Sequence, residues 1–160
     1  MDQWTEARYA FAARWARGKR VLLASGPEQG REQLARVCRN LVEDGPADLV
    51  VALHVEGWER RLDQWQQALV EPGELLVSTP GCDEESFRTL LAGRFPHLRV
   101  FAEVHLEAVV STLPEVLHIA GFVECPVPEA AATTGLVAVC SSRSLPASPP
   151  FVHLPADQNV

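Results

Sequence analysis

The chain has 160 residues, of which 47% are hydrophobic and 22% are charged, and its net charge at neutral pH is −7. This length suits one domain with a core of its own. The acidic charge argues against a general nucleic-acid binder, because phosphate binding depends on clustered lysines and arginines. No apolar run approaches the ~20 residues of a membrane helix, and the polar, acidic first residues do not resemble a signal peptide. We therefore expect a cytoplasmic protein that binds neither nucleic acid nor membranes.

Helices and strands alternate through residues 3–73. Trp4, Phe11 and Trp15 lie on one face of a helix predicted over residues 3–17. In chain order, this helix is followed by a strand at 20–25, a turn at 26–30, a helix at 31–44, a strand at 49–55 and a helix at 57–73. Both strands are apolar on both faces, as in a parallel sheet that helices cover on each side.

The second half of the chain predicts further strands and one more helix. Asp83 stands where it can cap this helix, and the acidic residues behind it favour a helix N-terminus. The predicted elements are a strand at 74–79, a helix at 84–95 and strands at 98–109 and 135–141. Residues 143–160 are too rich in proline for regular structure and form a tail. The alternation predicts an α/β domain over residues 1–142, with about five strands in a mostly parallel sheet flanked by helices.

Cysteines and histidines give no sign of a disulfide framework or a metal site. Cys38, Cys82, Cys125 and Cys140 form no CxxC pair. We expect Cys38 and Cys140 to be small buried residues. The five histidines show neither HxxxH nor HxH spacing. A zinc site built from residues far apart in the sequence stays open, but no metal ligand is predicted.

Long parts of this pattern occur together in a known family. Residues 8–36 contain a helix, an apolar strand and a glycine turn, and residues 48–81 contain a strand, a helix and a strand reached through a Pro-Gly turn. With residues 86–101 and 135–146, their order and spacing resemble the class I S-adenosylmethionine-dependent methyltransferases. The resemblance implies a Rossmann-type fold, with the cofactor bound at the carboxyl ends of the strands where strand order reverses.

The glycine turn departs from the family's pattern. In the family the first strand ends in an acidic residue, and a Gly-x-Gly-x-Gly loop lets the backbone approach the cofactor. Leu22 and Leu23 occupy the place of the acid. Glu28 stands between Gly26 and Gly30, where the family has its middle glycine. The resemblance makes Gly26, Glu28 and Gly30 the remnant of a cofactor-binding loop.

A larger part of the cofactor site is expected to be missing. In the family a second strand ends in an acid that binds the ribose hydroxyls, and a further helix and third strand hold the adenine. Here the helix predicted at 31–44 leads through Gly45 and Pro46 directly into the next strand. The second strand, its helix and the third strand then have no counterpart. Glu28 and Glu56 are candidate substitutes for the lost ligands, or else solvated loop carboxylates.

The resemblance also implies a place beside the substrate for Glu56, because Glu56 matches a position where the family has an acidic residue or a histidine. The departures nevertheless favour a catalytically inactive methyltransferase-like domain, which works as a binding, scaffolding or regulatory subunit with no catalytic residue and no cofactor. The alternative is a methyltransferase whose missing S-adenosylmethionine-binding elements come from a partner chain. The sequence does not support an enzyme of another class, because Ser78 and Cys82 do not lie in a nucleophile motif.

Protein contacts are expected at one edge of the sheet. Without a second strand, the strand at 20–25 lies at this edge. Residues 21–25 carry no charge and no proline, so the edge lacks the usual protection against pairing with another chain. The sequence predicts a homodimer or a complex with another protein that covers this edge and the helix at 31–44.

Overall fold

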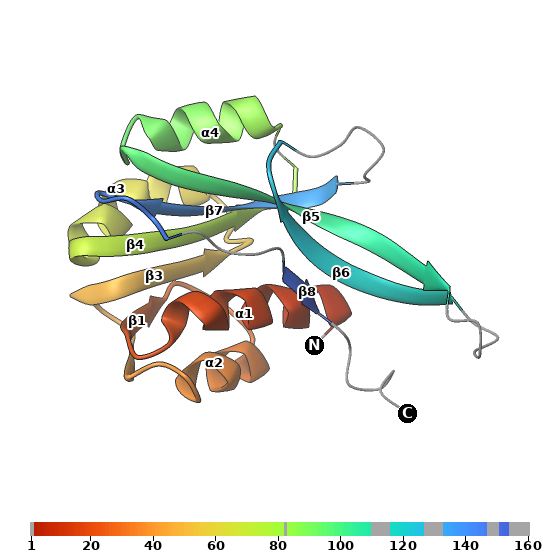
Figure 1. Ribbon diagram of the computed structural model, residues 1–160. Coiled ribbons are helices and arrows are strands. Elements are labelled where there is room, and N and C mark those ends of the chain that lie inside the picture. The colour runs from red at the N-terminus through yellow and green to blue at the C-terminus, as the bar shows by residue number, and fades with distance from the viewer. Residues whose placement is uncertain (1, 82, 110–115, 127–132, 147–150, 154–160) are drawn as a thin grey trace.

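Figure 1 shows the computed structural model of the protein. It describes residues 2–81, 83–109, 116–126, 133–146 and 151–153. The helices are α1 (Gln3–Ala16), α2 (Glu28–Ala35), α3 (Trp58–Ala68) and α4 (Glu84–Ala92). The strands are β1 (Arg20–Leu23), β2 (Asn40–Val42), β3 (Ala47–Leu53), β4 (Leu69–Thr79), β5 (His97–Val109), β6 (Val116–Glu124), β7 (Thr133–Ser141) and β8 (Phe151–His153).

The described strands form a single sheet in the order β2-β1-β3-β4-β7-β5-β6-β8. The first four in this order run parallel, with Val21 of β1 paired to Leu41 of β2 and to Leu49 of β3. β7 lies antiparallel between β4 and β5, and β6 and β8 continue the sheet in antiparallel pairs. The predicted α/β fold with a parallel core is confirmed, although the described strands outnumber those expected.

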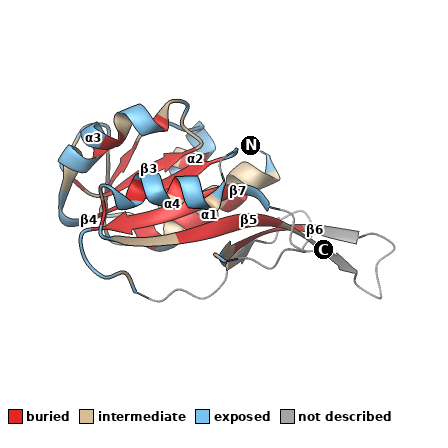
Figure 2. Ribbon diagram, turned by 90° about the horizontal axis from the view of Figure 1, so that it is seen from above, coloured by how far each residue is buried: buried red, intermediate tan, exposed pale blue. Residues whose placement is uncertain are grey.

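Helices cover both faces of the sheet, with α1 and α2 on one face (Figure 1) and α3 and α4 on the other (Figure 2). Asp2 caps α1, because its carboxylate accepts hydrogen bonds from the N–H groups of Trp4 and Thr5 at 3.0 and 2.9 Å. Asp83 caps α4 by accepting the Ser86 N–H at 2.9 Å, as predicted. Each cap satisfies N–H groups that the first helical turn leaves without a partner.

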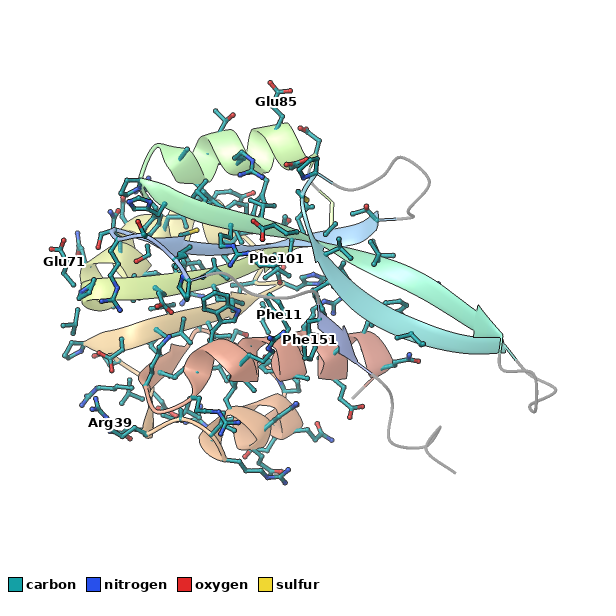
Figure 3. All side chains as sticks on the ribbon, in the orientation of Figure 1. Phe11, Arg39, Glu71, Glu85, Phe101 and Phe151 are labelled. Carbon is teal, nitrogen blue, oxygen red and sulfur yellow. The ribbon has the colours of Figure 1, made fainter. Side chains whose placement is uncertain are left out.

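An aromatic cluster fastens α1 to the antiparallel side of the sheet (Figure 3). Phe11 stacks on Phe122 of β6 with ring centroids 4.7 Å apart. It also meets Phe101 of β5 and Phe151 of β8 edge-on, at 5.2 and 5.8 Å. Phe11 and Phe101 are 1% exposed and Phe122 is fully buried. The cluster therefore joins segments from both ends of the chain into one core.

The helix predicted over residues 31–44 is wrong beyond Ala35, where α2 ends. The chain then turns, and residues 40–42 form β2 beside β1. Val37 and Cys38 pack against the core from this turn, so the apolar spacing of a helix continues after the helix has ended. The second strand, which the sequence predicts to be missing, is present. β1 is consequently an interior strand and not the open edge, and β2 takes the edge position.

Residues 43–46 alone connect β2 to β3, although both strands run in the same direction. The chain must return from the carboxyl end of β2 to the amino end of β3 and cross β1, which ordinarily takes about a dozen residues or more. A Cβ on Gly45 would lie 2.8 Å from the Cβ of Ala68, the last residue of α3. The crossover therefore passes β1 on the α3 side of the sheet and needs a glycine where it meets the helix.

Other boundaries also differ from the prediction. α3 ends at Ala68, and Leu69 already pairs with Ala47, so β4 begins inside the helix predicted at 57–73. β6 has no predicted counterpart. The tail expected to be irregular forms β8 at residues 151–153, paired with β6. The domain boundary at residue 142 stays a prediction.

The described residues contain no cluster of side chains suited to a metal ion. No helix among them is long and apolar enough to cross a membrane, and the expected cytoplasmic location stays a prediction. Cys140 is fully buried, as expected, and burial raises the pKa of its thiol. Cys38 is only partly buried, in the turn before β2.

Replacing Gly45 with alanine should destabilise the fold by about 1–3 kcal/mol in urea unfolding, because the added methyl group meets Ala68. Removing the Ala68 methyl group as well, in Gly45→Ala/Ala68→Gly, should recover part of this loss. Gly81→Ala is the control, since nothing lies within 4 Å of a Cβ at that position. Equal stability of Gly45→Ala and the wild type would show that the crossover does not press against α3.

Candidate functional site

The carboxyl ends of β1, β3 and β4 lie together at one end of the sheet, which is where doubly wound folds bind ligands. This end of the sheet is called the ligand edge below, and it differs from the lateral edge formed by β2. Gly26, Glu28 and Gly30 lie in the loop and first turn that join β1 to α2. Glu56 lies in the neighbouring turn between β3 and α3, and both glutamates are exposed. The structure thus places the predicted site residues in adjacent connections at this edge. Their role in binding stays a prediction.

Tyr9 of α1 fills the space beside both glycines. It is 2% exposed, and its hydroxyl donates a hydrogen bond to the Ser25 carbonyl at 3.3 Å. A Cβ on Gly26 would lie 1.9 Å from the Tyr9 hydroxyl oxygen, and one on Gly30 would lie 2.6 Å from the ring. Burial raises the pKa of Tyr9, so the hydroxyl stays neutral. The chain's own tyrosine accounts for both glycines without any ligand.

Glu43 directly follows β2, at the strand end where the resemblance places the ribose-binding acid. Sequence-based prediction misses this position, because the helix predicted at 31–44 conceals the strand end. The Glu43 side chain is 84% exposed, and its Oε1 lies 3.3 Å from Nη2 of Arg31. An exposed ion pair of this kind contributes little to stability, so Arg31 does not fix the carboxylate in place.

The helix and third strand that follow in the family have no counterpart between β2 and β3, as the sequence predicts. The crossover at 43–46 leads directly into β3. Between the crossover and α3 lies a groove of about 400 Å3, with residues 22–24 of β1 and its end at the base and Trp65 and Ala68 on the α3 wall. None of the predicted site residues lines this groove.

His54 follows β3 directly and has a strained backbone. Its φ of 50° lies in the left-handed region, which few residues other than glycine adopt. Its ring Nε2 is buried and has no hydrogen-bond partner within the described part of the chain. Burial lowers the pKa of His54, the positive charge of Arg8 adds to this, and Glu103 and Asp2 oppose it. The ring is therefore neutral at neutral pH.

A buried ion pair lies near His54. Glu103 of β5 is 1% exposed, and its carboxylate accepts hydrogen bonds from Nε and Nη2 of Arg8 at 2.8 and 2.9 Å. The Thr134 hydroxyl donates a further hydrogen bond to Oε1 of Glu103 at 3.1 Å. Such bidentate, charge-assisted hydrogen bonding offsets much of the free-energy cost of burying the two charges. The pair ties α1 to β5 and gives the Glu103 carboxylate a structural role.

Ser78, one of the nucleophiles considered from the sequence, is also structural. It is fully buried, and its Oγ accepts the backbone N–H of His54 at 2.8 Å. This bond holds the chain in the turn that follows β3. Cys82, the other nucleophile considered, lies outside the described residues.

Gly30→Ala should destabilise the protein by about 1–3 kcal/mol, because the new methyl group overlaps the Tyr9 ring. This loss should appear even though alanine favours a helix over glycine by about 1 kcal/mol. In a Tyr9→Ala background the same substitution should cost less, which a double-mutant cycle in urea unfolding measures. Gly93→Ala is the control, since its closest contact would be an ordinary 3.6 Å. Equal costs in both backgrounds would rule out this packing.

The free energy of unfolding should fall as the pH is lowered from about 7 to about 5. The unfolded chain takes up a proton on His54 near its ordinary pKa of about 6.5, while burial makes the folded chain resist protonation. The stability linked to His54 is thus present above that pKa and lost as the pH approaches the lower folded value. His54→Asn tolerates the same φ and should show a smaller pH dependence in urea unfolding. An unchanged dependence would contradict the assigned burial.

Comparisons with known proteins show the fold of the chain. No protein-family model matches the sequence, and no curated protein matches it. The structure is similar to the tRNA (m1A58) methyltransferase TrmI from Aquifex aeolicus, with a TM-score of 0.57 and 12% sequence identity, over 88% of this chain and 70% of that chain. The structure is less similar to a Corynebacterium diphtheriae protein described as a precorrin-6Y C5,15-methyltransferase targeted domain. That comparison has a TM-score of 0.49 and 11% sequence identity, over 85% of this chain and 95% of the other. The strand order and the similarity to TrmI show that the chain has the fold of the class I S-adenosylmethionine-dependent methyltransferases.

Proposed function

We propose that the chain is a catalytically inactive methyltransferase-like domain that acts through protein–protein contacts, as a binding, scaffolding or regulatory subunit. The observation that carries this proposal is the crossover at 43–46. It stands in place of the helix and strand that hold the adenine in the family. A small-molecule site usually buries about 70–90% of its ligand. An acid at the end of β2 cannot supply that burial by itself.

The residues at the ligand edge fit S-adenosylmethionine poorly. Leu22 and Leu23 stand where the resemblance expects an acid for the amino acid part of the cofactor, and both are 8% exposed. Tyr9 occupies the space beside Gly26 and Gly30. These features support a domain that needs no cofactor.

The outermost strand β2, at the lateral edge of the sheet, offers a surface for protein contacts. In β2, Asn40 is exposed, and Leu41 and Val42 are half-buried. β2 pairs on one side only within the described residues, so its outer backbone groups can bind another chain. Because β2 and not β1 is the outermost strand, we expect the homodimer or complex to form at β2 and the adjoining groove. The net charge of −7 favours a protein over a nucleic acid as the partner.

Glu43 favours the alternative, a methyltransferase whose missing elements come from a partner chain. This residue keeps the position of the ribose-binding acid at the end of β2, and its side chain is 84% exposed. A partner that packed against the crossover could then enclose the adenine. In that case the cofactor would bind to the complex and not to this chain alone.

The isolated chain should show no measurable binding of S-adenosylmethionine in isothermal titration calorimetry. A micromolar dissociation constant, worth about 8 kcal/mol, would overturn the proposal. Glu43→Gln is the matched variant, since it removes the charge and keeps the shape. Binding that appears only with a partner present and that weakens in Glu43→Gln would support the alternative function.

A further inference from the structure

The lateral edge of the sheet leaves backbone groups of β2 without a neighbouring strand. β1 lies on one side of β2, and the described part of the chain places no strand on the other side. The Asn40 N–H donates a hydrogen bond to the Lys19 carbonyl at 3.4 Å, so the amide of Asn40 faces β1. Because successive residues of a strand direct their backbone groups to opposite sides, the N–H and C=O of Leu41 face outward. A further strand can therefore pair with β2 through Leu41.

The charge of the side chains changes sign along this lateral edge. Backbone hydrogen bonds bring residues 17–19 beside residues 36–39, at the amino end of β2. Positive side chains outnumber negative ones there, with Arg17, Lys19, Arg20, Arg36 and Arg39 against Asp48 and Glu74. Negative side chains outnumber positive ones around the carboxyl end of β2 and in α2, with Glu28, Glu32, Glu43 and Asp44 against Arg31 and Arg61. The lateral edge is thus positive at one end and negative at the other.

The two residues that flank β2 carry opposite charges. Arg39 directly precedes the strand and Glu43 directly follows it. The Arg39 side chain is 66% exposed at the outside of the molecule (Figure 3), and its Nη2 lies 3.3 Å from Oδ2 of Asp48. The Glu43 side chain is 84% exposed, and its Oε1 lies 3.3 Å from Nη2 of Arg31. Exposed ion pairs of this kind are weak, so Asp48 and Arg31 do not prevent the flanking side chains from turning to another chain.

We propose that β2 pairs antiparallel with β2 of a second copy of the chain, with Leu41 opposite Leu41 on a two-fold axis. In this register Arg39 of each copy lies opposite Glu43 of the other. Opposed residues of opposite charge stabilise an antiparallel pair, and like charges destabilise it. The outward N–H and C=O of Leu41 exchange both hydrogen bonds with the same residue of the second copy. The inference rests on the proposed function, because it names the partner for the protein–protein contacts proposed there.

The charges of the lateral edge favour a second copy over another occupant. Short edge strands ordinarily resist pairing with other chains, and the regular part of β2 spans only residues 40–42. The flanking Arg39 and Glu43 complement each other in a second copy, and a two-fold axis makes this contact twice. A parallel arrangement in the same register would instead place Arg39 opposite Arg39. Each copy has a net charge of −7, but charges more than about 8 Å apart are largely screened at physiological salt.

Charge reversals test this pairing in the full chain. Sedimentation velocity should show that the wild type dimerises in a concentration series up to about 200 micromolar. Arg39→Glu and Glu43→Arg, made separately, should each raise the dimer dissociation constant by about tenfold or more, because like charges then oppose each other. An equimolar mixture of the two variants should dimerise again, since each opposed pair then has opposite charges. Arg143→Glu is the control, because Arg143 is exposed after the end of β7 and lies outside the lateral edge.

Hydrogen exchange measured by NMR locates the interface. The Leu41 amide should exchange more slowly in the wild-type dimer than in monomeric Arg39→Glu, because only the dimer gives its N–H a hydrogen-bond acceptor. Both replaced side chains are mostly exposed. The variants should therefore keep the wild-type fold, and recovery of the dimer in their mixture requires that fold.

The outcomes are distinguishable from failure of the proposed function. A wild-type chain that is monomeric at about 200 micromolar would overturn the inference. Single variants that dimerise as well as the wild type, a mixture that stays monomeric, or slowed exchange confined to residues outside 39–43 would also overturn it. The same samples are titrated with S-adenosylmethionine. Binding of the cofactor would overturn the proposed function, whereas a monomeric chain that binds no cofactor would overturn only this inference.

Discussion

The crossover at residues 43–46 determines what the ligand edge of this sheet can do. Because β2 and β3 both run parallel to β1, the chain must travel from the carboxyl end of one strand to the amino end of the other in this short stretch. Gly45 allows the crossover to pass against Ala68 of α3. The parallel core survives, since β1 keeps a neighbour on each side. No chain is left for the segments that enclose adenine in methyltransferases. One connection thus keeps β1 inside the sheet and stands where the family has a helix and a third strand.

Contacts within the chain occupy other parts of the same edge. Tyr9 packs beside the glycine loop and bonds to the Ser25 carbonyl. Arg8 and Glu103 form a buried ion pair between α1 and β5. His54 keeps a buried ring nitrogen that has no partner in the described part of the chain. With the aromatic cluster, the contacts of Arg8, Tyr9 and Phe11 hold the middle of α1 against the sheet. Side chains of the chain itself therefore fill the space beside the glycine loop and link α1 to β5.

Much of the fold follows from local patterns, because the strand and helix periods fix the spacing of apolar residues. The strand predicted at 49–55 overlaps most of β3, and the helix predicted at 57–73 contains all of α3. β2 could not be predicted in this way, since its residues are few and Leu41 continues the apolar spacing of α2. Glu43 stands at a strand end only because β2 precedes it, so this position could not be predicted either. Arg8 and Glu103 are 95 residues apart in the chain, so their contact follows from tertiary packing alone.

We infer that the ligand edge of this methyltransferase fold serves as a structural surface and binds no cofactor. The most direct measurement is an NMR titration of the isotope-labelled chain with S-adenosylmethionine at up to millimolar concentration, which detects even weak binding and locates it. The amide signals of Gly26, Gly30 and Glu43 should stay in place, because Tyr9 occupies the glycine loop and the crossover leaves the adenine without walls. Saturable shifts of these signals would contradict the account.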